Sequence, residues 1–118
     1  MKRSFVQCAE LRLATGADPA APGGAVTMAL CGSWDHAGAC RWPHRTAAKW
    51  NDGLGQVRVV FVAAAEEEAQ VRAEIERALS GGECVGPEGQ LSRWEAMGHE
   101  AGALSESEEE SGRRIADC

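Results

Sequence analysis

The sequence has little aromatic volume and no long apolar run. Its 118 residues include no tyrosine, and the aromatic side chains are Phe5, Phe61, Trp34, Trp42, Trp50 and Trp94. Much of the remaining apolar content is alanine, so we expect a small hydrophobic core. A core of that size gains useful stability from a bound metal, a ligand or a partner subunit. No apolar stretch approaches the roughly 20 residues that a membrane-spanning helix needs.

Several catalytic and targeting signatures are also missing. The chain has no Walker-type phosphate loop, no dinucleotide glycine fingerprint and no His-Glu-x-x-His pair, which disfavours nucleotide hydrolysis, dinucleotide redox chemistry and zinc proteolysis. The start resembles a secretory signal, but Gln7, Glu10 and Arg12 interrupt the stretch that follows. Five cysteines is an odd number, which fits free thiols or metal ligands better than a disulfide framework. We therefore expect a cytoplasmic protein.

The charge is negative overall and unevenly distributed. The net charge is −6; residues 1–65 carry seven basic against four acidic side chains, and residues 66–118 carry five against fourteen. Such an acidic total opposes the positive field that phosphate binding requires, so nucleic acid is not an expected partner. We expect a protein partner or a second copy of the chain, and no membrane partner.

Alternating apolar residues predict three strands. These are residues 5–14, 25–30 and 57–62, with a Gly/Pro-rich loop at 16–24 and a turn at 51–55. The first two strands are expected to pair with each other. The third is nearly continuous and β-branched, which indicates a central position in the sheet.

One helix is predicted over residues 66–80. Val71, Ile75 and Leu79 form its apolar stripe, Glu68 and Arg72 have the spacing of an ion pair, and Gly81-Gly82 ends it. Residues 91–97 fit either a helix or an edge strand.

The expected fold is a small two-layer α+β domain at residues 1–101. Three or four mostly antiparallel strands would pack against the main helix at 66–80. Residues 102–118 offer mainly like charges and little apolar surface, which predicts a disordered acidic tail.

Cys31, His36, Cys40 and His44 are the most concentrated set of potential metal ligands. Two thiolates and two imidazoles can complete a tetrahedral Zn²⁺ site, and the spacing permits closure in a glycine-containing loop. The paired Cys-x-x-Cys knuckle of familiar zinc sites is missing. We predict a structural zinc ion at these four residues. The alternative is a buried Cys31 with both histidines on the surface of a loop.

A basic and aromatic surface is predicted in the same loop, residues 31–55. If a helical turn begins at Pro43, basic residues spaced four apart form a stripe beside aromatic rings. The predicted partner-binding residues are Trp34, Arg41, Trp42, Arg45, Lys49 and Trp50. The alternative places the tryptophans in the core, where a small domain needs their volume.

These patterns predict a small cytoplasmic accessory or protein-interaction module whose tryptophan-rich loop is pinned by zinc, with no catalytic residue assigned. One alternative is a small enzyme in which Cys40 or Cys31 is the nucleophile and His36 or His44 is the base. Another is a metal-free ligand-binding or subunit-interface module.

Overall fold

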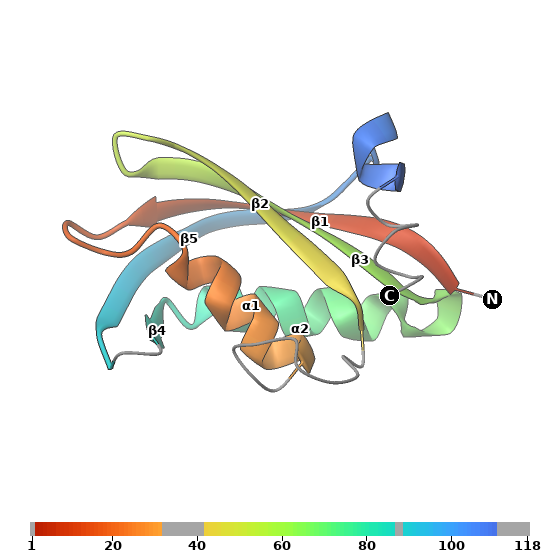
Figure 1. The fold of residues 1–118 in the computed structure, drawn as a ribbon, viewed down its shortest axis with the longest axis horizontal. Helices are drawn as coiled ribbons and strands as arrows, with labels where there is room; N and C mark the ends of the chain where they lie inside the picture. The colour runs from red at the N-terminus through yellow and green to blue at the C-terminus, as the bar shows by residue number, and fades with distance from the viewer. Residues whose placement is uncertain (1, 32–41, 87–88, 111–118) are drawn as a thin grey trace.

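A computed structural model describes residues 2–31, 42–86 and 89–110 of the chain (Figure 1). It contains one five-stranded sheet in the order β2-β3-β1-β5-β4, in which all neighbouring strands are antiparallel. The strands are β1 (Lys2–Leu13), β2 (His44–Asn51), β3 (Leu54–Ala64), β4 (Glu83–Val85) and β5 (Leu91–Gly102). The helices are α1 (Ala21–Cys31) and α2 (Glu68–Ser80), and the short 3-10 helix η1 (Ala65–Glu67) precedes α2.

The connections interleave two halves of the chain. β1 and β2 are joined through α1, yet β3 lies between them, and β3 and β5 are joined through α2 with β1 between them. These are split β-α-β units, and apart from the short β4 the strand order is that of the ferredoxin-like arrangement. Both helices lie on the same side of the sheet (Figure 1). We call the other side, which neither α1 nor α2 covers, the open face.

The core lies between the sheet and the helices. Cross-strand pairs such as Phe5 with Phe61 and Ala9 with Val57 point toward the helices, because alternate residues of a strand share one face. The helices bury complementary apolar residues: Val26 and Leu30 from α1, and Val71, Ile75 and Leu79 from α2.

Several predicted elements are confirmed. β1 and the interior strand β3 contain the predicted strands 5–14 and 57–62 almost entirely. The turn at 51–55 joins β2 to β3. Its central residues Asp52 and Gly53 have positive φ (53° and 81°), which is the geometry of a two-residue hairpin turn that matches the twist of the strands.

The predicted helix is confirmed as η1 and α2, with a left-handed residue, Gly82 (φ 74°), after its end. The predicted pair of Glu68 and Arg72 forms at 2.8 Å. Arg72 also donates to the carbonyl of Val6 and to Gln7 Oε1, at 2.7 and 2.8 Å, so it ties α2 to β1.

The predicted strand at 25–30 is wrong, because these residues belong to α1. Val26 and Leu30 satisfy the two-residue period of a strand, but their spacing of four also puts them on one side of a helix, and both are buried. Met28, which the strand prediction placed with them, is 40% exposed. β1 therefore pairs with β3 and β5 and not with this segment.

Residues 44–51 form strand β2 and not a helical turn, and residues 91–97 belong to strand β5. The sheet thus has five strands where three or four were expected, and a second main helix, α1, covers it. The coarser expectation of a small α+β domain with antiparallel strands is confirmed. Within the described residues, no helix has both the length and the apolar character needed to cross a membrane.

The first part of the predicted acidic tail packs against the sheet. Residues 106–110 are helical, and Glu108 pairs with Arg58 on β3 at 2.7 Å. Leu104 packs on apolar residues of the open face. An apolar anchor and an ion pair to the sheet offset the mutual repulsion of the acidic residues. Residues 111–118 of the predicted tail lie outside the described residues.

Candidate functional site

The two ends of the predicted zinc site fall within the described chain. Cys31 ends α1 and His44 begins β2, whereas His36 and Cys40 lie outside the described residues. His44 lies beside Thr27, which is one helical turn before Cys31. Over residues 2–31, 42–86 and 89–110, no group of three or more His, Cys, Asp or Glu side chains is placed to hold a metal ion. Zinc binding by the four residues stays a prediction.

The His44 ring is buried between β2 and α1, with 8% of the residue exposed. Its Nδ1 lies 3.2 Å from the Trp42 carbonyl and its Nε2 lies 3.1 Å from Thr27 Oγ1. A carbonyl can only accept, so Nδ1 carries a proton, and in the neutral ring Nε2 accepts from the threonine hydroxyl. A donated Nδ1–H is also typical of metal-binding histidines, but a metal at Nε2 would have to replace the Thr27 hydroxyl.

The predicted partner-binding residues divide between the two sides of β2. Trp42 precedes the strand and is 4% exposed, and Trp50 packs against the core from the helix-covered side. Arg45 and Lys49 are exposed on the open face, since a spacing of four is even and so keeps both residues on one side of a strand. Trp34 and Arg41 lie outside the described residues. Of the predicted partner-binding residues that the structure describes, the basic ones are exposed and the tryptophans pack against the core.

The described cysteines have environments that disfavour a nucleophile. Desolvation by burial raises the pKa of the Cys8 thiol, although Arg58 opposes the shift, and burial also raises the pKa of Cys84. A nucleophilic cysteine needs the opposite, a thiolate that is stabilised near neutral pH. Cys40, one of the two cysteines of the predicted catalytic alternative, is outside the described residues, and nothing is described of the Cys31 side chain.

The open face carries basic residues on β2, acidic residues on β5 and both signs on β1, where Arg12 lies opposite Glu95. Arg45 and Lys49 line the outer strand β2, whereas Glu10 on β1 and Glu95 and Glu100 on β5 point from the other side of the same face. All five side chains are exposed. A surface with this layout orients a charged partner and speeds its encounter.

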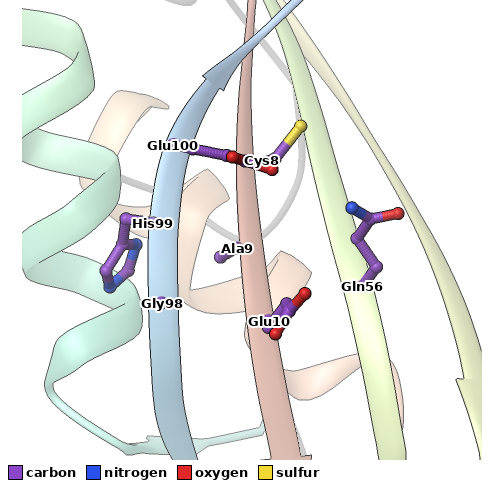
Figure 2. Close-up of a pocket in the computed structure, with 7 residues that line it drawn as sticks. All are labelled: Cys8, Ala9, Glu10, Gln56, Gly98, His99 and Glu100. Atoms are coloured by element: carbon purple, nitrogen blue, oxygen red, sulfur yellow. The ribbon is translucent and has the colours of Figure 1, made fainter.

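A hollow of about 200 Å³ opens among the acidic residues of this face (Figure 2). Gly98 forms part of its floor because it has no side chain, and Cys8, Glu10, Gln56 and Glu100 surround it. His99 points the other way, toward α2, where its Nε2 lies 3.2 Å from Ser80 Oγ (Figure 2). The two carboxylates give the hollow a preference for positively charged groups.

Beside the hollow, toward the β2–β3 hairpin, lies an open groove that exposes large apolar side chains. It is lined by Glu10, Leu11, Leu54, Gly55, Gln56 and Met97 and has a volume of about 380 Å³. Leu54 and Met97 are 46% and 51% exposed, respectively. Large apolar side chains that share an exposed groove with polar groups are typical of an interaction site.

The other end of the open face contains a small apolar cluster, which we call the pit. It consists of the buried residues Val6, Cys8 and Val60, and Leu104 packs against them. Arg58 stands at the edge of the pit, where its Nη1 lies 3.2 Å from Cys8 Sγ. We call residues 103–110, which cross this end of the sheet, the strap (Figure 1).

Arg58 holds the strap through several hydrogen bonds. Its Nε and Nη2 donate to the two carboxylate oxygens of Glu108, at 2.8 and 2.7 Å, and Nη2 also donates to the Ala103 carbonyl at 2.8 Å. This fork geometry lowers the pKa of Glu108 to about 2 and raises the pKa of Arg58. Ser105 adds a local cap: its amide donates to Glu108 Oε1 and its hydroxyl accepts from the Glu108 amide.

Sequence reasoning missed Cys8, Arg58 and Glu108. One signal was present in the sequence. Val60 and Val62 make β3 apolar on both faces, which indicates that another segment covers the open face. The sequence does not show which segment that is. Comparison of the chain with protein-family models, curated proteins and solved structures found no match.

Proposed function

We propose that the protein is a small accessory module that binds a protein partner through the open face of its sheet. The observation that carries the proposal is the groove of Leu54 and Met97, which exposes large apolar side chains between the basic strand β2 and strand β5, which carries Glu95 and Glu100. The apolar part supplies affinity on burial, and the charged flanks supply orientation and specificity.

The predicted zinc ion belongs to this proposal as a structural element. Zinc at Cys31, His36, Cys40 and His44 would brace the chain between α1 and β2 and so fix the edge of the sheet that carries Arg45 and Lys49. Support comes from α1 and β2 lying side by side, with Thr27 against His44. The proposed location is the cytoplasm, where thiols stay reduced.

The test is a partner-binding measurement with matched surface variants. A partner isolated with the wild-type chain would be purified, and its affinity would be measured for Met97→Glu, Leu54→Glu and the control Val85→Glu. Val85 is 55% exposed on β4 and does not line the groove, so the control introduces the same charge elsewhere. We expect each groove variant to lose about tenfold or more in affinity, because burial of one large side chain contributes about 1.5–3 kcal/mol.

The control should keep the affinity of the wild type. Equal binding by the wild type and both groove variants would refute the groove as the binding surface. Circular dichroism and thermal melting of each variant check that the fold is retained.

A further inference from the structure

The strap shows what kind of ligand the covered end of the open face accepts. It supplies one apolar side chain, Leu104, to the pit and one carboxylate, Glu108, to Arg58. In the strap, Leu104 precedes the helical turn that begins at residue 106, and Glu108 lies in that turn, three residues after its cap Ser105. The contact therefore has two separate parts, an apolar anchor and a forked ion pair.

The receiving surface is built from the sheet alone. Val6 and Cys8 come from β1, and Arg58 and Val60 come from β3, so their positions are fixed by strand pairing whether or not the strap is present. Cys8 faces Arg58, and Val6 faces Val60, in direct cross-strand register. A site on two paired interior strands is formed in advance and loses little conformational entropy on binding.

The strap lies outside the sheet and is attached to it through the pit and Arg58. Its helical turn begins at residue 106. Glu106, Glu108, Glu109 and Glu110 repel one another along this turn. The strap takes no part in the pairing of the strands, so its displacement does not require the sheet to unfold.

We propose that the pit and Arg58 form a binding site for an acidic segment of a partner protein, with a leucine just before a short helix and a glutamate in the first turn of that helix, and that the strap occupies this site until such a segment displaces it. The proposal rests on the proposed function and names the chemistry of the partner. A leucine fills the space above Val6, Cys8 and Val60, and a carboxylate replaces Glu108 on the Arg58 fork.

Alkylation of Cys8 in the full chain measures whether the strap opens. We expect Glu108→Gln and Leu104→Ala each to raise the rate at Cys8 by about tenfold, because one removes a charged hydrogen bond and the other the apolar anchor. Glu109→Gln is the matched control. Glu109 is exposed, and its substitution removes the same charge at the neighbouring position. Cys84 in the same molecules is the internal standard, because it lies on β4 away from the strap. Unchanged rates at Cys8 in both strap variants would overturn the idea of a displaceable strap.

Binding of a peptide in trans tests the site. The probe is a synthetic peptide with the sequence of residues 103–110, added to the full-length Glu108→Gln variant, whose own strap is weakened. We expect the peptide to bind this variant at least about tenfold more tightly than wild type, to slow alkylation of Cys8, and to lose this binding when Arg58→Gln is added. No binding to a variant whose Cys8 has become reactive, or equal binding after Arg58→Gln, would overturn the proposed site.

The two tests separate this proposal from the groove proposal. Peptide binding should depend on Arg58 and be unchanged by Met97→Glu, because Met97 lines the groove and is not part of the pit. A failed peptide experiment therefore leaves the partner measurement with the groove variants unaffected.

Discussion

Arg58 connects three parts of the molecule that are distant in sequence. Its guanidinium group reaches Glu108 and the Ala103 carbonyl in the strap and lies against Cys8 on β1. Planar donors that bind both oxygens of one carboxylate make stronger and more specific contacts than a lysine ammonium does. We therefore regard Arg58 and Glu108 as the pair that decides whether the strap stays on the sheet.

The pair predicts a loss of strap stability in acid. The folded pKa of Glu108, about 2, is lower than its ordinary value of 4.5, so the ionised form favours the folded state. The stabilisation is complete at pH values above about 4.5 and is lost as the pH falls toward 2. We expect Glu108→Gln to lower the free energy of unfolding by about 1–3 kcal/mol at pH 7 and by much less near pH 2.

Urea unfolding of wild type and Glu108→Gln at several pH values measures this difference. Glu109→Gln should show no comparable loss at any pH. A Glu108→Gln effect that is as large at pH 2 as at pH 7 would show that the ion pair is not its cause.

His44 gives a second prediction at the level of single residues. In metal-free protein, Thr27→Val should lower stability by about 1 kcal/mol, because it removes the hydroxyl that meets His44 Nε2 and leaves the side-chain shape nearly unchanged. If zinc occupies Nε2 in the metal-loaded protein, the same substitution should have almost no effect there. Thermal melting with and without a chelator makes the comparison, and no loss in the metal-free form would contradict the role assigned to Thr27.

Among the elements, the junction between α2 and β4 depends on one glycine. Gly82 has φ +74°, and a Cβ at this position would lie 2.9 Å from the Trp94 carbonyl oxygen, which is closer than side chains approach. Its own carbonyl accepts from the Trp94 amide at 2.9 Å, so the backbone cannot shift without loss of that bond.

We therefore expect Gly82→Ala to cost about 2–4 kcal/mol, which combines left-handed strain with overpacking. Gly89→Ala is the matched control: φ is +84° there, but nothing lies within 4 Å of the added Cβ, so only the strain of about 1–2 kcal/mol applies. Denaturant unfolding measures both variants. An equal loss in the two would show that the contact with Trp94 is not significant.

The helix α1 and the strand β5 show why part of the fold could not be predicted from the sequence. In β3 and α2, by contrast, the spacing of the apolar residues fits only one kind of element, and both were predicted closely. α1 has apolar residues at spacings of two and four together, so only its packing on α2 distinguishes helix from strand. In β5, Leu91, Trp94 and Met97 have the spacing of a helix, but Trp94 is buried while Leu91 and Met97 are exposed, so the three do not form one apolar stripe.

The candidate site was less predictable than the fold because it forms between distant segments. The exposed basic residues Arg45 and Lys49 were identified from the sequence, because residues four apart lie on the same side of a helix and also on the same side of a strand. The contact between Arg58 and Glu108 spans 50 residues and depends on where the strap crosses the sheet, which no local pattern encodes. The four predicted zinc ligands still require a direct measurement.

At the scale of the whole molecule, zinc should contribute to global stability. Metal analysis of protein purified without added metal should find about one zinc per chain, and Cys40→Ser should lower both the zinc content and the melting temperature. Cys84→Ser is the control, because Cys84 is a free thiol on β4 outside the predicted ligand set. Absence of zinc together with an unchanged melting temperature for Cys40→Ser would rule out a structural metal.

The interleaved strand order also constrains how the chain folds as it is synthesised. β1 is paired on one edge with β3 and on the other with β5, and both of these strands are synthesised after it. β1 and β2 cannot complete a sheet by themselves, since the strand that separates them has yet to be translated. The apolar residues of β1 therefore stay without their sheet partners on the nascent chain until β3 and β5 have been made.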